Sequence, residues 1–193
     1  MYRNTFLSVM FLACCFNGSL CAQSDAQIYE RTCDAKTYPF SDPSPVATPN
    51  NSYYPYFRFD GFSMQAQEKQ WKMVVLENDY VKLTVTPEIG GKIWGAIDKV
   101  NNKEFVYTNG VVKFRDVAMR GPWTSGGIEF NFGIIGHAPT CSTPIDYLTK
   151  KNVDGSVSCH IFSYEWITRT VWNVEINLPK DKAYFTTHTT WFN

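Results

Sequence analysis

The feature that most limits how this chain can fold is a series of short segments with strand periodicity, separated by turn residues. In one segment Val81, Leu83 and Val85 alternate with polar residues, which is the two-residue period of a half-buried strand. Turn dipeptides such as Asn109-Gly110 separate other segments. No long stretch has helical periodicity, so the pattern predicts an all-β fold over residues 71–193, an antiparallel β-sandwich or barrel. The other strand-like segments are residues 91–98, 104–109, 111–114, 156–166, 170–176 and 183–192.

The last strand-like segment extends to the end of the chain, because residues 189–193 (TTWFN) keep a strand composition. A terminal strand without a partner exposes a sheet edge. We therefore expect an unpaired edge or apolar face near residues 183–193. We also expect the sandwich to be incomplete in this chain and to be finished by sequence that follows it in the natural protein.

The first 22 residues have the pattern of a secretory signal peptide. Arg3 supplies the positive charge, residues 6–16 (FLSVMFLACCF) form an apolar run, and Leu20-Cys21-Ala22 precede the expected cleavage point. The run is shorter than the roughly 20 apolar residues that span a bilayer. The predicted localisation is therefore secreted or periplasmic. The alternative is a lipoprotein, in which lipid on Cys14 would attach the chain to a membrane.

Residues 23–70 are predicted to form an irregular lead-in that packs across the sandwich. A series of prolines from Pro39 to Pro55 interrupts regular structure. Aromatic residues between Tyr53 and Phe62 make the segment too apolar for a disordered tail. The predicted organisation is thus a signal peptide (1–22), this lead-in (23–70) and a β-sandwich domain (71–193).

Charge and cysteine content exclude several classes of function. The chain has 18 basic and 18 acidic residues and no basic stripe, so no nucleic-acid partner is predicted. Without the signal peptide, Cys33, Cys141 and Cys159 remain, which leaves open one disulfide plus a free thiol. The chain has no Cys-x-x-Cys motif and no histidine pair with metal-ligand spacing, so neither a metal nor a cofactor is predicted.

Two segments carry more polar and glycine residues than strand patterning requires. In the first, Glu88 lies just before Gly90-Gly91, where the backbone can adopt positive φ or pass close to a ligand. Glu88 is therefore a candidate substrate-binding carboxylate, with a solvated turn charge as the alternative.

The second segment, residues 120–139 (RGPWTSGGIEFNFGIIGHAP), combines a glycine-rich backbone with side chains suited to sugars. Arg120, Trp123 and Asn131 are predicted to bind substrate. Guanidinium and amide groups pair with hydroxyls, and a tryptophan face covers the apolar side of a sugar ring. Strand alternation places Glu129 and Asn131 on one side, away from the apolar neighbours. An ordinary solvent-facing strand edge gives the same alternation.

Glu129 and His137 are the candidate catalytic residues. Imidazole groups exchange protons near neutral pH, so a histidine beside a ligand can act as a general acid or base. A single loop histidine can equally be structural. A partly buried carboxylate needs a positive partner, and Arg120 is the expected partner of Glu129.

The segments LENDYVKLTVTPEIGGKIWGAIDK (76–99), FVYTN (105–109) and GPWTSGGIEFNF (121–132), with His137 shortly after, resemble the DUF5107 family. That family is found at the start of large secreted or periplasmic bacterial proteins, often with tetratricopeptide repeats downstream. The resemblance implies a galactose-mutarotase-like supersandwich and carbohydrate as the ligand. Family relatives often carry two adjacent histidines where this chain has Gly136-His137. The late glutamate base of mutarotases has no counterpart here, so a complete mutarotase site is not expected.

These observations together predict a carbohydrate-binding domain of a secreted glycan-processing protein, with an oligosaccharide or polysaccharide as its partner. One alternative is a sugar-active enzyme, either aldose epimerase-like or a glycoside hydrolase, completed by C-terminal sequence. A hydrolase needs two carboxyl groups, for which Glu129 and Glu88 are the visible candidates. The other alternative is a structural domain for protein partners.

Overall fold

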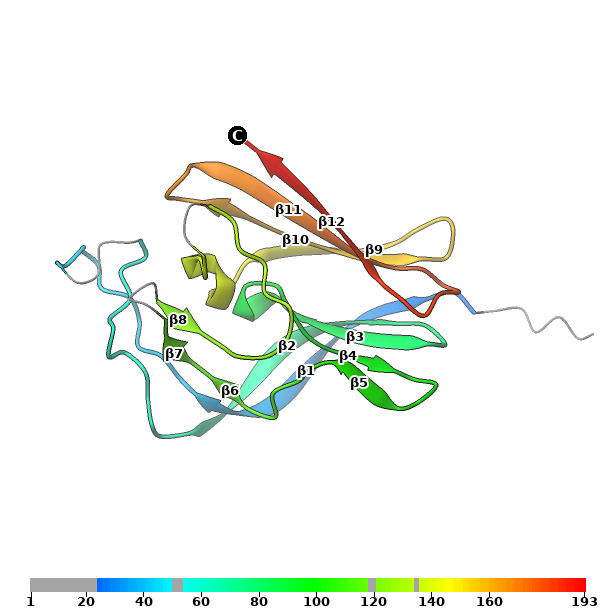
Figure 1. The fold of residues 1–193 in the computed structure, drawn as a ribbon, viewed down its shortest axis with the longest axis horizontal. Helices are drawn as coiled ribbons and strands as arrows, with labels where there is room; N and C mark the ends of the chain where they lie inside the picture. Colours follow the sequence, from blue (N-terminus) through cyan, green and yellow to red (C-terminus); the bar gives the residue numbers. More distant parts are fainter. Residues whose placement is uncertain (1–23, 50–53, 118–120, 134–135) are drawn as a thin grey trace, which may run out of the picture.

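The computed structural model describes residues 24–49, 54–117, 121–133 and 136–193. Within these ranges the chain forms strands, two short 3-10 helices and no α-helix, which confirms the all-β prediction (Figure 1). The elements in chain order are β1 (Gln27–Tyr38), β2 (Gln67–Glu77), β3 (Val81–Thr86), η1 (Pro87–Ile89), β4 (Lys92–Asp98), β5 (Lys103–Val106), β6 (Val112–Lys113), β7 (Arg115–Asp116), β8 (Pro122–Trp123), η2 (Pro139–Ser142), β9 (Asp146–Lys151), β10 (Val157–Glu165), β11 (Thr170–Leu178) and β12 (Thr186–Phe192).

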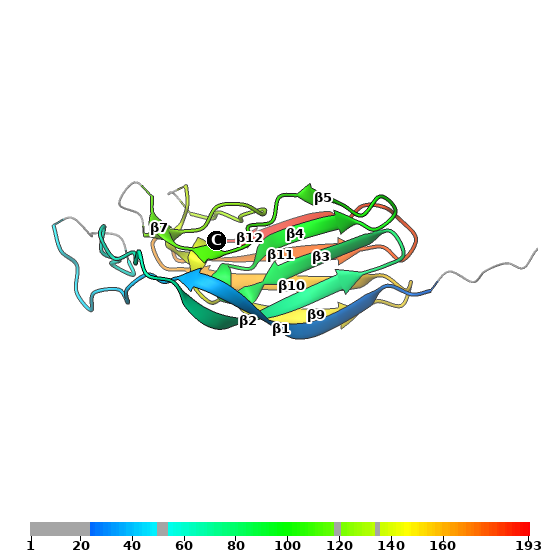
Figure 2. The same ribbon diagram turned by 90° about the horizontal axis from the view of Figure 1, so that it is seen from below.

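The larger sheet has the strand order β5-β4-β3-β2-β1-β6 and is seen face-on in Figure 2. Strands β1 to β5 pair antiparallel, whereas β6 pairs in parallel with β1 at the edge opposite β5. Residues 107–111 therefore connect the two edges, and Thr108 and Val112 line one pocket together with Arg31 of β1 and Trp94 of β4. The sheet is therefore curled, and residues 107–111 cross over its concave face.

The second sheet, in the order β12-β11-β10-β9, is antiparallel throughout and faces the first (Figure 1). The main hydrophobic core lies between the two sheets and includes Leu83 of β3 and Val174 of β11. In both strands buried residues alternate with half-exposed ones, as the sequence pattern predicts. Phe132, from the segment after β8, stacks on Trp172 at 4.5 Å between ring centroids and extends this core.

The Asn78 side chain links the two sheets at one end by hydrogen bonds. Its side-chain oxygen accepts the backbone N–H groups of Tyr80 and Val81 at 2.8 and 2.7 Å, which shapes the turn between β2 and β3. Its amide nitrogen donates to the carbonyl oxygens of Pro179 and Lys182 at 2.7 and 2.8 Å, in the turn between β11 and β12. This buried side chain thus satisfies both its donors and its acceptor across the two layers.

The prediction of an irregular segment over residues 23–70 is wrong for its first part. Residues 27–38 form β1, which pairs with β2 from Gln27↔Glu77 to Thr37↔Gln67. The sequence of this strand lacks the alternation of apolar and polar residues, because most of its side chains are exposed and many are polar. The pairing with β2 specifies the strand, whereas apolar alternation does not. In the remainder, the described residues 39–49 and 54–66 are irregular, as expected.

The C-terminal strand β12 lies at the edge of its sheet. Among the described residues it pairs only with β11, and most of its side chains are exposed. Trp191 and Phe192 are both about half exposed. The expected unpaired edge near residues 183–193 is therefore present.

The described residues also bear on the cysteines and on membrane insertion. Cys33, Cys141 and Cys159 are all free thiols, and the latter two are buried. Within the described ranges, no helix has the length and apolarity needed to cross a membrane. The predicted signal peptide and the alternative lipid site at Cys14 lie outside the described residues.

Candidate functional site

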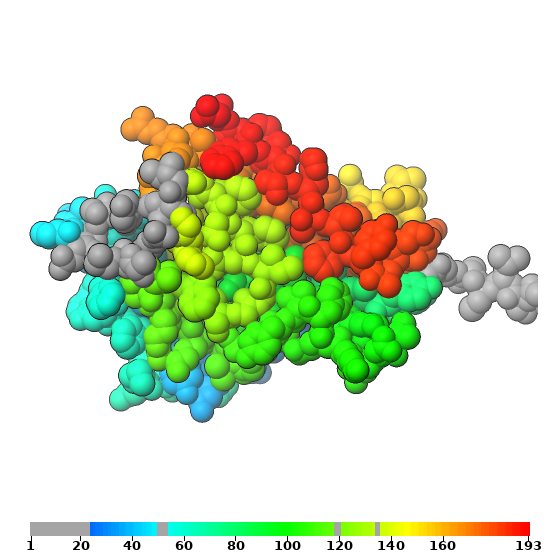
Figure 3. Space-filling view, viewed as in Figure 1, coloured from blue at the N-terminus to red at the C-terminus, as the bar shows by residue number. Residues whose placement is uncertain are grey.

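The segment of residues 121–133 is held between the two sheets and lies on the face seen in Figure 3, where it is coloured yellow-green. Ile128 forms two backbone hydrogen bonds with Ile93 of β4, at 3.1 and 2.8 Å. Gly127 has a φ of 68°, and a Cβ atom there would collide with the carbonyl oxygen of Ile93. Only glycine permits this close approach, so the Gly126-Gly127 pair places the next residues against β4.

Alternation along this segment separates apolar from polar side chains. Ile128 and Phe130 pack against the main core. Glu129 and Asn131 lie on the other side, and the amide nitrogen of Asn131 donates to Glu129 Oε1 at 2.8 Å. This is the arrangement that strand periodicity predicts.

Glu129 is the centre of the candidate site, which we call the Glu129 cluster and define as Lys92, Trp123, Glu129, Asn131 and His137. Glu129 Oε1 lies 2.7 Å from His137 Nδ1, and Oε2 lies 3.8 Å from Lys92 Nζ. The Glu129 side chain is 12% exposed and that of His137 is 41% exposed. Oε2 is buried and has no hydrogen-bond partner among the described residues. One carboxylate therefore holds a surface histidine and faces a buried lysine.

Lys92 is a buried cation, with a side chain only 1% exposed. Its ammonium group donates to the backbone oxygen of Thr124 at 2.5 Å and to the Thr124 hydroxyl at 3.0 Å. Burial lowers the pKa of Lys92, and the negative charge of Glu129 partly opposes that shift. Lys92 is thus a positive group beside Glu129, whereas the expected partner Arg120 lies outside the described residues.

Trp123 and the backbone after His137 complete the cluster. The Trp123 ring meets the His137 ring edge-on, with 5.7 Å between centroids, and Lys92 Nζ lies 6.0 Å from the Trp123 centroid. Asn131 Oδ1 accepts the backbone N–H of Ala138 at 2.9 Å. His137 has a φ of 54°, so its backbone adopts the left-handed region, and these contacts hold the ring beside Glu129.

The structure brings together Trp123, Glu129, Asn131 and His137, and it places Glu88 elsewhere. Glu88 Oε2 accepts the backbone N–H of Lys72 at 2.5 Å. Arg120 lies outside the described residues. Sequence reasoning missed Lys92, because a lysine after Gly90-Gly91 has the appearance of a turn charge. Burial of Lys92 follows from its position in β4, where it pairs with the buried residue Thr86, and this pairing cannot be read from the local sequence.

The comparison with known proteins identifies the family. The family described as "Domain of unknown function (DUF5107)" matches residues 48–193. The chain belongs to the DUF5107 family. The DUF5107 chain is also similar to the crystal structure of a TPR-domain containing protein from Parabacteroides distasonis ATCC 8503, with 26% identity and a TM-score of 0.79. That similarity covers 89% of this chain and 30% of the other protein, so the chain spans about a third of the length of its relative.

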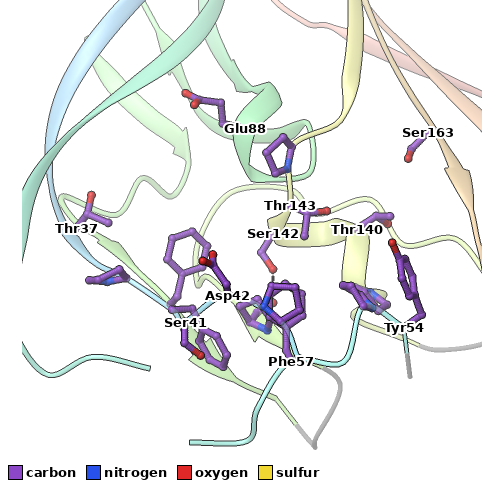
Figure 4. Close-up of a pocket in the computed structure, with 18 of the residues that line it drawn as sticks. Thr37, Ser41, Asp42, Tyr54, Phe57, Glu88, Thr140, Ser142, Thr143 and Ser163 are labelled. Carbon is purple, nitrogen blue, oxygen red and sulfur yellow. Dashed lines mark hydrogen bonds between the residues drawn. The ribbon is translucent and has the colours of Figure 1, made fainter. Parts of the chain in front are cut away.

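This DUF5107 chain has a further pocket of about 510 Å³ at one end of the two sheets (Figure 4). It is formed by the lead-in, the start of β2, η2 and the end of β10, and Glu88 lies in its wall. The Glu129 cluster contributes no side chain to this wall. Within the described residues, no three His, Cys, Asp or Glu side chains come together in a way that could hold a metal ion.

Proposed function

We propose that this DUF5107 domain binds carbohydrate at the Glu129 cluster, as part of a secreted or periplasmic glycan-processing protein. The observation that supports this most is the grouping of three side chains suited to a sugar ligand around one carboxylate. Glu129 fixes His137 and Asn131 by hydrogen bonds, and Trp123 lies against the same histidine. Preorganised polar groups beside an aromatic ring are what sugar recognition needs, because hydroxyls require hydrogen bonds and C–H faces require a flat apolar surface.

The hydrogen bond to Glu129 also determines what His137 can offer a ligand. A carboxylate accepts from Nδ1–H, so the neutral ring keeps its lone pair on Nε2. Nε2 can then accept a hydrogen bond from a sugar hydroxyl. Asn131, which is exposed, adds an amide group beside it.

The fold supports the same proposal. Two facing, largely antiparallel sheets are the architecture expected of a galactose-mutarotase-like domain, and we propose that type for this chain. The similar structure belongs to a longer protein described as containing a TPR domain. We therefore also propose that the domain presents glycan within a longer protein that carries tetratricopeptide repeats.

The test is isothermal titration calorimetry of the purified chain with neutral hexasaccharides of glucose, xylose, mannose and galactose. Trp123→Ala and Glu129→Gln should each weaken binding about tenfold or more. Tyr184→Ala removes a ring that is 53% exposed outside the cluster, and it should bind like the unchanged chain. Equal affinity of all four proteins for every sugar would refute binding at the cluster.

A second candidate function, a sugar-active enzyme, is favoured by the 2.7 Å contact between His137 and Glu129. A histidine oriented by a carboxylate is a competent general base, because the carboxylate stabilises the imidazolium that forms when the base takes a proton. Aldose epimerisation needs a general base. The reaction can be followed by polarimetry of freshly dissolved monosaccharides. Turnover that disappears in His137→Gln while sugar binding persists would support catalysis over binding alone.

A further inference from the structure

We infer that the 510 Å³ pocket at the end of the two sheets is a second carbohydrate site, selective for neutral glycans. Its volume falls within the range of about 300–1,000 Å³ that is typical of small-ligand sites. The choice of carbohydrate as the ligand class rests on the proposed function, whereas the pocket itself is built from residues outside the Glu129 cluster.

Aromatic rings form one wall of this pocket. Tyr54, Tyr164 and Trp166 line it. Trp166 contacts both tyrosines, with 5.8 Å between its ring centroid and that of Tyr54 and 4.9 Å to that of Tyr164. The three residues are between 38% and 63% exposed. Exposed rings that line a cavity offer faces for a sugar ring to cover, and their contacts with each other hold them in place. Figure 4 shows Tyr54 beside Thr140 at one side of the cavity.

A hydroxyl in the pocket wall lacks a partner. Thr140 Oγ1 is buried and has no hydrogen-bond partner among the described residues. Buried polar atoms in folded proteins nearly always have partners, so an unpaired one that lines a pocket indicates a polar ligand group. By contrast, Trp71 Nε1 in the same wall donates to Thr37 Oγ1 at 2.9 Å and is already satisfied. The combination of apolar rings with an unpartnered buried hydroxyl matches a sugar better than a hydrocarbon.

The charges around the pocket determine which sugars fit. Three carboxylates line it, from Asp42, Glu88 and Glu165, against one ammonium group from Lys69. That ammonium lies 3.8 Å from the Trp71 ring centroid, over its face. An excess of negative charge repels uronate and sulfated glycans, because like charges brought close together weaken binding.

The pocket and the Glu129 cluster are separated by a shared wall. Pro122 and Pro139 line the pocket, whereas Trp123 and His137, one and two residues away, belong to the cluster. The Ser142 hydroxyl donates to the backbone oxygen of Pro122 and ties the wall together. Each site can therefore be altered by substitutions that leave the side chains of the other in place.

The experiment is calorimetry of the full chain with the same neutral hexasaccharides and with hexagalacturonate. Trp166→Ala and Thr140→Val should each weaken binding of a neutral hexasaccharide about tenfold in a Trp123→Ala background. Hexagalacturonate should not bind in that background. Thr140→Val should keep or raise the melting temperature, since it removes an unpaired buried hydroxyl, and this excludes misfolding as the cause of weaker binding.

The outcomes separate the two sites. If only Trp123→Ala and Glu129→Gln weaken binding, the second site is refuted and the proposed function stands. If only Trp166→Ala and Thr140→Val weaken it, the second site stands and binding at the Glu129 cluster is refuted. Absence of binding to any neutral hexasaccharide, or equal binding of hexagalacturonate in the Trp123→Ala background, overturns the inference.

Discussion

The Nζ atom of Lys92 lies 3.8 Å from Oε2 of Glu129, and both side chains are largely withdrawn from solvent. Each charge offsets the cost of burying the other. Removing one partner of such a pair leaves an uncompensated buried charge, whereas removing both leaves two neutral groups. The pair therefore gives a direct test of how the Glu129 cluster is stabilised.

Lys92→Met is expected to lower the free energy of unfolding by about 3 kcal/mol, because it leaves Glu129 without its cation. The double variant Lys92→Met/Glu129→Gln should lose less than the single variant. Lys72→Met, at an exposed pair with Glu30 at 3.9 Å, should cost less than about 1 kcal/mol. Urea unfolding measures all three, and a double variant no more stable than Lys92→Met would contradict the pairing.

Gly127→Ala is expected to destabilise the chain by about 2–3 kcal/mol, because the residue has a φ of 68° and its new Cβ would meet Ile93. Gly110→Ala is the matched control, since a Cβ at that position has no heavy atom within 4 Å. Thermal unfolding of the two variants distinguishes them. A similar melting temperature for both would mean that the segment does not approach β4 as described.

Asn78→Ala is expected to cost about 2–4 kcal/mol, because it leaves buried backbone groups in two turns without partners. Asn101→Ala removes an exposed side chain that donates to Asp98 at 2.6 Å, and it should cost less than about 1 kcal/mol. The comparison is made by chemical denaturation at neutral pH. Equal losses would show that Asn78 does not link the two sheets.

The buried thiols should be unreactive in the folded protein. Burial raises the pKa of Cys141 and of Cys159 to about 12, with the charge of Glu129 adding to the shift at Cys141 and that of Glu30 to the shift at Cys159. At pH 8 iodoacetamide should therefore modify half-exposed Cys33 first and the other two only after unfolding. Mass spectrometry of peptides from native and denatured protein measures the order.

The same thiols make a predictable contribution to stability at alkaline pH. A folded-state pKa above the ordinary value of 9.0 stabilises the fold below pH 9, and that stabilisation is lost as the pH rises towards 12. Replacing buried Cys159 with Val should reduce the loss of stability between pH 9 and pH 11. An unchanged slope of unfolding free energy against pH would argue against a raised thiol pKa.

Strands β3, β10 and β11 could be predicted from the sequence, because their apolar residues face one shared core. The alternation of Val81, Leu83 and Val85 predicts β3, and the pattern of residues 170–176 predicts most of β11. Strand β1 could not be predicted in this way. Its exposed polar side chains give no alternation, and its structure depends on pairing with β2, about 40 residues away on average, which local pattern does not encode.

Contacts of the candidate site within a single segment could be predicted from the sequence. Contacts that join distant segments could not. Alternation alone places Glu129 beside Asn131, and the glycines explain the approach to β4. The contact with Lys92 joins residues 37 positions apart and depends on the register of β4, so no local motif indicates it. The same holds for the second pocket, which gathers Tyr54, Thr140 and Trp166 from distant segments.

The position of β1 also shows that the larger sheet extends beyond the start of the family match. The DUF5107 match begins at residue 48, yet β1 ends at Tyr38 and lies between β2 and β6. A polypeptide trimmed to residues 48–193 would have neither the partner along β2 nor the strand that holds β6. Such a truncated chain should expose Trp71 and Met73 to solvent and aggregate on expression, whereas one that begins at residue 24 should remain soluble.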